Sequence, residues 1–239
     1  NVAVDVSKEI LNLLEGRPVE NAVNIPRFDP DLMAQMGPFM ELARVLGDFI
    51  SQLAPENPGK VSFQYNGKLA SYDCMPITVA GLAALLDRCT DQEVNMVNAN
   101  LVAERRGLIV EQGRSTESEF FSNLITLTLT TPTGQRTIAG TLFEGMPKVV
   151  RMRDFATDFT PEEHMLVMTY PDQPGLIGKV GTILGNAKIN IGSMNLGRRA
   201  KGGEAMVVLS IDTPVSAETL EELSTAIGAR FIKAVNLDK

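Results

Sequence analysis

The sequence has little of what several common classes of protein require. Acidic residues outnumber basic ones by 29 to 22 among 239 residues, which gives a formal net charge of -7. Nucleic acid or an anionic membrane surface needs a basic face that releases counterions, so this balance argues against both partners. No apolar run approaches the roughly 20 residues of a membrane-spanning helix, and the N-terminus lacks the pattern of a signal peptide. We therefore expect a cytoplasmic protein.

Cysteine and histidine are also scarce. Cys74 and Cys89 lack the spacing of metal ligands, and we expect both to be reduced thiols. The single histidine, His164, stands at the start of a predicted strand, and we expect a structural or solvent-exposed role for it. The sequence therefore predicts no metal site.

One stretch, Met165 to Leu196, reads as a strand, a capped helix and a second strand, with polar residues at both joints. The turn at residues 171–175 holds two prolines, which stop the strand, and Asp172 is placed to accept hydrogen bonds from the first N–H groups of the helix. Apolar residues then recur at helical spacing until Gly185. Ligand-type side chains at both joints predict a small-molecule site.

The same pattern continues to the end of the chain. Its elements are expected at 165–170 (strand), 175–186 (helix), 189–197 (strand), 204–211 (strand), 217–226 (helix) and 229–237 (strand). The order βαββαβ is that of a ferredoxin-like fold, with Ser216 and Gly228 capping the second helix. Its outer strands are sheet edges, which favours pairing with a second copy.

The middle of the chain predicts an α+β domain over residues 28–163. Asp29-Pro30 reads as a helix start, and further helices are expected from Pro38, from Pro76 and from Thr90 to Gly107. The expected strands form an antiparallel sheet with one face covered by helices, at residues 61–65, 108–111, 124–131, 135–143 and 148–153. The asparagines at 95, 98 and 100 indicate either hydrogen bonds that hold the helix to the sheet or the floor of a pocket.

The N-terminal segment has a different character. Val2, Val6 and Ile10 mark one apolar face of a helix, and residues 21–26 read as a linker that ends at a domain boundary near Arg27. A helix this short with an apolar face and no upstream partner is not stable alone. We therefore expect the chain to be part of a longer protein.

Three parts of the chain carry a resemblance to one enzyme family. The run from His164 to Gly175, followed by Asn190-Ile191 and Gly197-Arg198, resembles the ACT domain of D-3-phosphoglycerate dehydrogenase. The middle of the chain resembles the intervening or allosteric substrate-binding (ASB) domain of the long form of that enzyme, at Tyr65-Gly67-Leu69-Ala70, Val94-Asn95-Val97-Asn98-Ala99, Glu104-Arg105-Gly107 and Ala139-Gly140-Thr141-Leu142-Phe143. Residues 1–5 and 21–26 are similar to the last helix of its nucleotide-binding domain and the exit from it.

The resemblance implies an α+β chain in three parts: a remnant of the nucleotide-binding domain (1–27), an ASB domain whose antiparallel or mixed sheet is covered by helices (28–163) and an ACT domain (164–239). It implies the regulatory and oligomerisation region of an enzyme that oxidises 3-phosphoglycerate with NAD, the first step of L-serine biosynthesis. The assembly it implies is a homodimer through the ACT edge strands, or a homotetramer.

The chain lacks the dehydrogenase's own machinery, since that chemistry requires a phosphate-binding glycine loop and an acid/base histidine. Gly175, Gly178 and Gly181 lie three residues apart within the predicted helix, which indicates one closely packed helix face and no nucleotide loop. We therefore expect no cofactor and no catalytic residue in this fragment, and NAD only in the full-length enzyme.

For the effector L-serine, the resemblance implies contacts from Tyr170, Asp172, Pro174, Gly175, Leu176, Ile177, Asn190 and Ile191. The chemistry agrees, because a helix N-terminus suits a carboxylate, Asp172 suits an ammonium group, and Asn190 offers a donor and an acceptor. Tyr170 is placed to close the pocket. The alternative is that Asp172 only caps the helix and Asn190 only turns the chain.

An anion site in the ASB domain has four candidate cations, Lys148, Arg151, Arg153 and Arg105. Strand alternation predicts Arg151 and Arg153 on one face and Lys148 on the other. By resemblance Lys148 matches a basic position of the family's pocket, whereas Thr160 and Ser210 stand where some members have arginines. The alternative is that these cations are solvated surface charges.

Two other functions fit parts of the pattern. One is the β-type subunit of an iron–sulfur L-serine dehydratase, which has similar ASB and ACT segments but does not explain residues 21–26. The other is a stand-alone amino-acid-binding dimerisation module.

Overall fold

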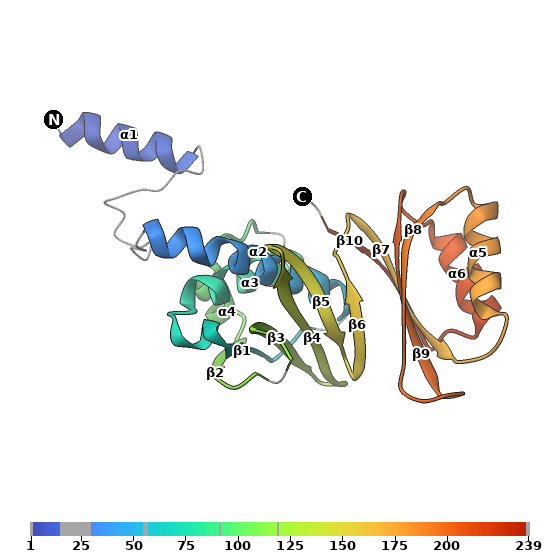
Figure 1. Ribbon diagram of the computed structural model, residues 1–239. Coiled ribbons are helices and arrows are strands. Elements are labelled where there is room, and N and C mark those ends of the chain that lie inside the picture. Colours follow the sequence, from blue (N-terminus) through green and yellow to red (C-terminus); the bar gives the residue numbers. More distant parts are fainter. Residues whose placement is uncertain (1, 15–29, 55–56, 91, 119, 238–239) are drawn as a thin grey trace. The chain divides into compact units, whose positions relative to one another are not determined.

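A computed structural model describes residues 2–14, 30–54, 57–90, 92–118 and 120–237 (Figure 1). They form two compact units, Asn1–Gly37 and Pro38–Lys239. The first unit contains α1 (Val2–Leu14), the predicted N-terminal helix, whose Val4, Val6 and Ile10 are exposed. The predicted linker at 21–26 and the boundary near Arg27 lie outside the described residues.

Helix α2 (Pro30–Leu53) is continuous, and Pro38 lies inside it. The prediction that Pro38 begins a separate helix is therefore wrong. A proline removes one backbone hydrogen bond and favours a kink, but the residues on both sides of it remain helical. From Leu42 to Ile50 the predicted apolar stripe is buried.

The first sheet has six strands in the order β2-β1-β3-β4-β5-β6. Strands β1 and β2 are parallel, and the other neighbouring pairs are antiparallel. The strands are β1 (Lys60–Gly67), β2 (Ile109–Ser115), β3 (Asn123–Thr131), β4 (Gly134–Phe143), β5 (Met146–Met152) and β6 (Phe155–Phe159). The sheet is therefore mixed, and β6 was not predicted.

One face of this sheet holds the core of the domain that was predicted over residues 28–163. Residues of β1 and β3 alternate between buried and half-buried positions, and the buried ones include Phe63 and Leu127. Helices α2 and α3 (Met75–Asp87) cover this face: a Cβ added to Gly140 of β4 would lie 2.8 Å from Leu42 of α2. Thr126, Thr128 and Thr130 of β3 occupy the opposite, less buried face, so the prediction that helices cover one face of the sheet is confirmed.

The segment after α3 differs from the prediction. A short 3-10 helix, η1 (Lys68–Ser71), precedes α3, but the predicted helix from Thr90 to Gly107 is reduced to α4 (Ala99–Arg105). Asn95 Oδ1 accepts from the backbone N–H of Val97, and Asn98 Oδ1 accepts from that of Asn95. These side-chain bonds compete with helix formation, which explains why the helix starts late.

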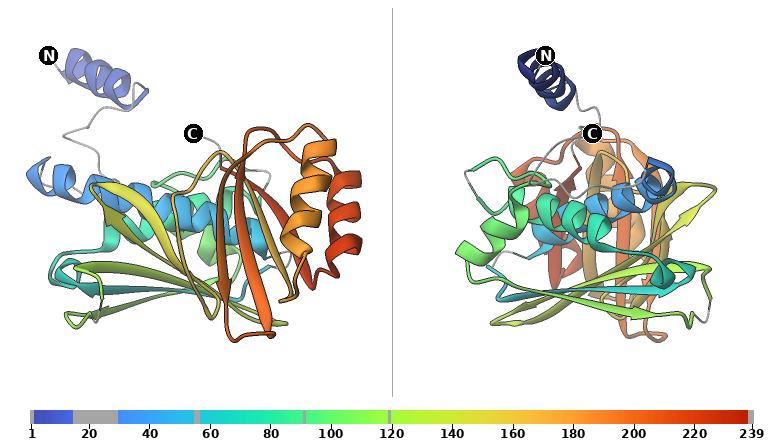
Figure 2. Two further views of the ribbon diagram at one scale, coloured as in Figure 1. Left: turned by 45° about the vertical axis from the view of Figure 1, so that its right-hand side comes forward. Right: turned by 90° about the vertical axis from the view of Figure 1, so that its left-hand side faces the viewer.

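The second sheet has the order β10-β7-β9-β8, as a ferredoxin-like fold requires. Its elements are β7 (His164–Pro171), α5 (Leu176–Asn186), β8 (Ile191–Arg198), β9 (Glu204–Ile211), α6 (Ala217–Ile227) and β10 (Phe231–Asn236). Both helices cover one face of the sheet, and their apolar residues form a core with Leu166, Met168 and Leu209 (Figure 2). The predicted caps of α6 are confirmed: Ser216 accepts from the N–H of Thr219, and Gly228 has a φ of 60°.

The other face of the second sheet packs against the domain that contains the first sheet. The side chain of Asn195 in β8 accepts from the Thr157 hydroxyl at 2.7 Å and donates to the carbonyl oxygen of Asp158 at 2.7 Å. Gln52 of α2 donates to the backbone carbonyl oxygen of Asn236 and accepts from its N–H. The two sheets are thus joined at several points within one compact unit.

Both cysteines are free thiols, as predicted. Burial raises the pKa of the Cys74 thiol and of the Cys89 thiol, and nearby Arg114 and Arg106 respectively oppose the shift. In the described part of the chain, no helix is both long and apolar enough to cross a membrane.

Candidate effector site

The turn between β7 and α5 presents an open helix N-terminus. Gly175 is the residue that precedes the helix, with a φ of 88°, a conformation that side-chain-bearing residues rarely adopt. No side chain of the described residues caps the helix, so the prediction that Asp172 accepts from its N–H groups is wrong. The first N–H groups, which belong to residues such as Leu176 and Ile177, have no side-chain acceptor and are suited to an anion.

Asp172 is held by the turn between β8 and β9 instead. Its backbone N–H donates to the carbonyl oxygen of Gly203 at 2.8 Å. Its carboxylate accepts from Arg198 Nη1 and from the N–H of Gly202, both at 3.4 Å. These two side-chain contacts are long, which leaves the carboxylate with capacity for a further donor.

Tyr170 does not lie over a pocket. Its side chain is 2% exposed and packs in the core with Leu176 and Val180 of α5. Its hydroxyl has no hydrogen-bond partner in the described part of the chain. Burial, and then the negative charge of Asp172, raises the pKa of Tyr170. The residue is a core element that ends in an unsatisfied polar group.

Asn190 lies at the other end of the sheet. Its Nδ2 donates to Asp212 Oδ2 at 2.9 Å, and its backbone carbonyl oxygen accepts from the N–H of Asp212. Pro171 pairs with Glu204 and Ile191 pairs with Ile211, seven positions further along β9. At about 3.3 Å per residue the two joints are roughly 20 Å apart. One chain alone therefore cannot bring Asp172 and Asn190 to the same small ligand.

Strand β8 and helix α5 leave an apolar surface uncovered on this side of the domain. Strand β8 is an outer strand, and Met194, Leu196 and Ile177 are 39%, 40% and 45% exposed. A Cβ added to Gly178 or Gly181 would meet nothing within 4 Å. The predicted close packing of a glycine face is therefore not satisfied within the described residues. Gly175 also stands before the helix and outside that face.

The four candidate cations of the ASB domain do not form one site. A β-bulge between Val149 and Arg151 shifts the register, so Lys148 pairs with Thr141 and Arg151 with Ala139. Thr141 and Ala139 lie on the same face of β4, which places Lys148 and Arg151 on one face and makes the predicted division wrong. The sequence carries no clear signal for this bulge.

The remaining two cations point elsewhere. Arg153 follows β5 in a turn with a φ of 53° and lines a cavity of about 30 Å³ together with Thr169 of β7. Arg105 ends α4, which packs against α3. Lys148 forms an ion pair with Asp158 and lies 5.4 Å from the centre of the Phe143 ring. Its charge is therefore already neutralised.

His164 has the structural role that its position predicts. Its Nδ1 is 3.1 Å from Asn236 Oδ1, and its Nε2 is 3.7 Å from a carboxylate oxygen of Glu163. Among the residues that the structure describes, no three His, Cys, Asp or Glu side chains converge on a possible metal site.

The segments that contain most of each sheet match two different family models. Residues 35–153 match the family model of the D-3-phosphoglycerate dehydrogenase intervening domain, and residues 164–228 match that of the ACT domain. Proteins named D-3-phosphoglycerate dehydrogenase from Synechocystis and from Bacillus subtilis are each 34% identical over 99% of this chain. One from Archaeoglobus fulgidus is 32% identical over 95% of it.

The chain spans 43%, 45% and 44% of the length of these three relatives, which is less than half of each. The two matched segments follow one another in the order of the two sheets. Residues 35–153 therefore belong to the intervening-domain family of D-3-phosphoglycerate dehydrogenases, and residues 164–228 belong to the ACT family.

Proposed function

We propose that this chain is the regulatory and oligomerisation region of a D-3-phosphoglycerate dehydrogenase, and that two paired ACT domains sense L-serine. The names of the relatives and the match to the intervening domain support the enzyme family. The oxidation of 3-phosphoglycerate with NAD is then the task of the whole protein. Residues 1–239 transmit the state of the effector site.

The separation of the two joints carries this proposal. Antiparallel pairing of β8 with β8 of a second copy turns one sheet end for end relative to the other. The end that carries Asn190 then lies beside the end of the second copy that carries Asp172 and Gly175. Two half-sites that are useless within one chain become complete sites in a dimer.

The exposed surface of β8 and α5 fits such a pairing. Met194, Leu196 and Ile177 supply apolar area, and an outer strand supplies unpaired backbone groups. Gly178 and Gly181 permit the close approach of another helix or strand. Covering this surface removes both an exposed edge and an exposed apolar patch from water.

Each half-site has groups for part of a serine molecule. The uncapped N-terminus of α5 suits the carboxylate, with Pro174 and Gly175 shaping the approach and the N–H groups of Leu176 and Ile177 as donors. Asp172 suits the ammonium group. Asn190 of the other copy suits the hydroxyl, because no described group donates to its Oδ1, and Ile191 anchors that end of β8. The side chain of Tyr170 packs in the core with residues of α5.

Calorimetric titration with L-serine tests this function. We expect saturable binding at up to one site per chain, and we expect Asn190→Ala to weaken the affinity at least about tenfold, because it removes a polar contact to the ligand. Asn100→Ala, an exposed asparagine of α4 in the ASB domain, is the matched control and should leave binding unchanged.

Light scattering, which measures the mass of the assembly, and thermal unfolding with and without serine together separate sensing from a purely structural role. A serine sensor shows a dimer whose thermal stability rises with serine. The absence of both heat and a thermal shift at millimolar serine would contradict the proposal, whatever the oligomeric state.

A further inference from the structure

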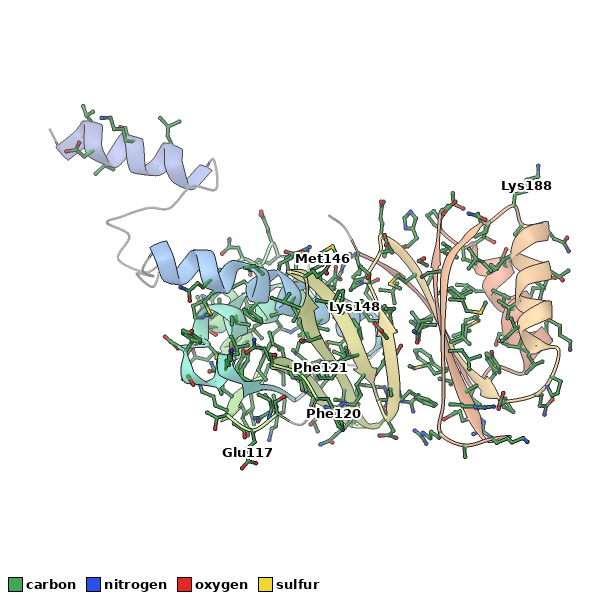
Figure 3. All side chains as sticks on the ribbon, viewed as in Figure 1. Glu117, Phe120, Phe121, Met146, Lys148 and Lys188 are labelled. Atoms are coloured by element: carbon green, nitrogen blue, oxygen red, sulfur yellow. The ribbon has the colours of Figure 1, made fainter. Side chains whose placement is uncertain are left out.

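The wet face of the ASB sheet contains a cavity that the effector site does not use. It has a volume of about 810 Å³, in the range of small-molecule pockets. Its lining comes from the loop between β2 and β3 and from the ends of β3 to β6: Asn66, Ser115, Glu117, Ser118, Phe120, Phe121, Leu124, Ala139, Val150, Arg151, Asp154, Ala156 and Thr157. Figure 3 shows Phe120 and Phe121 beside this sheet, with Glu117 near them.

We propose that this cavity binds a small monocarboxylate with an apolar body, whose carboxylate pairs with Arg151. The proposal concerns the ASB domain alone and does not depend on serine sensing by the ACT domain.

Charge pairing singles out Arg151. Among the charged residues of the lining, Asp154 is already bound to Arg199 at 2.6 Å. Arg151 is exposed and has no acidic partner among the described residues; its one hydrogen bond is a long one, from Nη2 to Thr126 Oγ1 at 3.5 Å. A guanidinium with most of its donors unused is the preferred partner of a carboxylate, which it can hold with two parallel hydrogen bonds.

The apolar part of the lining sets the rest of the ligand. Phe120 is 84% exposed, and Phe121 lies beside it in the same loop. Val150, at the β-bulge, and Leu124 add aliphatic surface. An exposed aromatic side chain over a sheet gains free energy when an apolar ligand covers it. A strongly hydrophilic anion would gain nothing from these walls.

The number of cations decides against a phosphate. Lys148 lies on the same face as Arg151, but it lines a neighbouring cavity of about 490 Å³ and is paired with Asp158. A single available arginine matches the charge of a monocarboxylate, whereas a phosphate dianion requires further convergent cations.

The carboxylate of Glu117 favours a ligand that also carries an ammonium group. Its backbone carbonyl oxygen accepts from Asn66 Nδ2, and its carboxylate has no basic partner among the described residues. Asn66 and Thr126 are diagonal neighbours on β1 and β3, about 7–8 Å apart. An α-amino acid with an apolar side chain would present its ammonium group to Glu117 and its carboxylate to Arg151, which both line the cavity, so the test compares ligands with and without that group.

The test is titration of the full chain with 3-phenylpropionate and, separately, with L-phenylalanine, followed by calorimetry and by amide NMR shifts. We expect saturable binding of at least one probe, with shifts at Phe120, Phe121 and Arg151. Arg151→Gln should weaken the affinity at least about tenfold. Arg105→Gln, an exposed arginine of α4, is the control and should leave the affinity unchanged.

A second variant keeps the test independent of folding defects. Phe120→Ser alters only an exposed side chain and should lower the affinity for both probes with an unchanged melting temperature. A preference for L-phenylalanine that Glu117→Gln abolishes would assign the ligand to the amino acids. Binding of neither probe, equal binding by Arg151→Gln, or a cavity closed by a second copy would overturn the proposal, even where serine binds normally.

Discussion

At the scale of single residues, backbone conformation distinguishes the glycines around α5. Gly175 has a positive φ and precedes the helix, whereas Gly178 lies within it at an exposed position. In the left-handed region an L-residue is strained by about 1–2 kcal/mol, but inside a helix glycine is the worse choice by about 1 kcal/mol. The same substitution therefore has opposite effects at two sites three residues apart.

Gly175→Ala should lower the free energy of unfolding by about 1–2 kcal/mol, because the added Cβ meets no clash but the backbone must keep its φ. Gly178→Ala should raise it by up to about 1 kcal/mol in the monomer. Urea unfolding of both variants measures this. Equal signs for the two changes would refute the assignment of their conformations.

At the scale of elements, the segment before α4 shows side chains replacing a helix. Asn98 accepts from the N–H of Asn95 at 2.8 Å and donates to the carbonyl oxygen of Glu93 at 3.1 Å. Asp87 Oδ1 accepts from the N–H of Val94. These bonds satisfy backbone groups that a helix would otherwise satisfy, so the segment is ordered without being helical. The predicted hydrogen bonds from these asparagines to the sheet are not the ones observed, because the side-chain bonds of Asn95 and Asn98 stay within residues 93–98.

Asn98→Ala removes both of these bonds and should cost about 1 kcal/mol of stability. Asn100→Ala, two residues later at an exposed position of α4, should be neutral or stabilising by a few tenths of a kcal/mol, because alanine is the better helix former. Thermal unfolding followed by circular dichroism compares the two. A larger loss for Asn100→Ala would contradict the observed bonding.

At the scale of the whole molecule, the ASB and ACT sheets are joined at both ends of their contact. At one end, Arg88 of the ASB domain donates to the carbonyl oxygen of Asn236 at 2.8 Å and pairs with Asp48, which is 5% exposed. At the other end, Arg199 pairs with Asp154 and stacks on Phe155, with 4.9 Å between the guanidinium and the ring centre. The two domains should therefore unfold together.

Calorimetry of the full chain should show one unfolding transition for the unit that begins at Pro38. Gln52→Ala removes two hydrogen bonds to the backbone of Asn236 and should cost about 1–2 kcal/mol, because an edge strand loses its anchor. Gln135→Ala, at an exposed position of β4, is the control and should cost less than about 0.5 kcal/mol. Two separate transitions in the unaltered chain would show that the contact is too weak to couple the domains.

Much of the fold follows from local patterns because its causes are local. The alternation in β1 and β3, the stripe of α2, the Ser216 cap and the left-handed glycines each depend on neighbours a few residues away. Strand β6 escaped prediction because its five residues show no simple alternation, and its position depends on pairing with β5. Pro38 misled for the opposite reason, since proline is a strong local signal for a helix start, yet the residues on both sides of it are helical.

Local patterns in the sequence were enough to predict the order of the two sheets, most of their strands and helices, and the residues at the two joints of β7, α5 and β8. Which of those residues meet depends on how the strands pair in the folded chain. A parallel β-α-β unit places its two joints at opposite ends of a sheet, so Asp172 and Asn190 are separated, and the carboxylate of Asp172 binds a turn that is distant in sequence. A single bulge likewise moved Lys148 and Arg151 to one face. Pairing register and long-range contacts depend on the whole chain, which is why no local pattern predicts them.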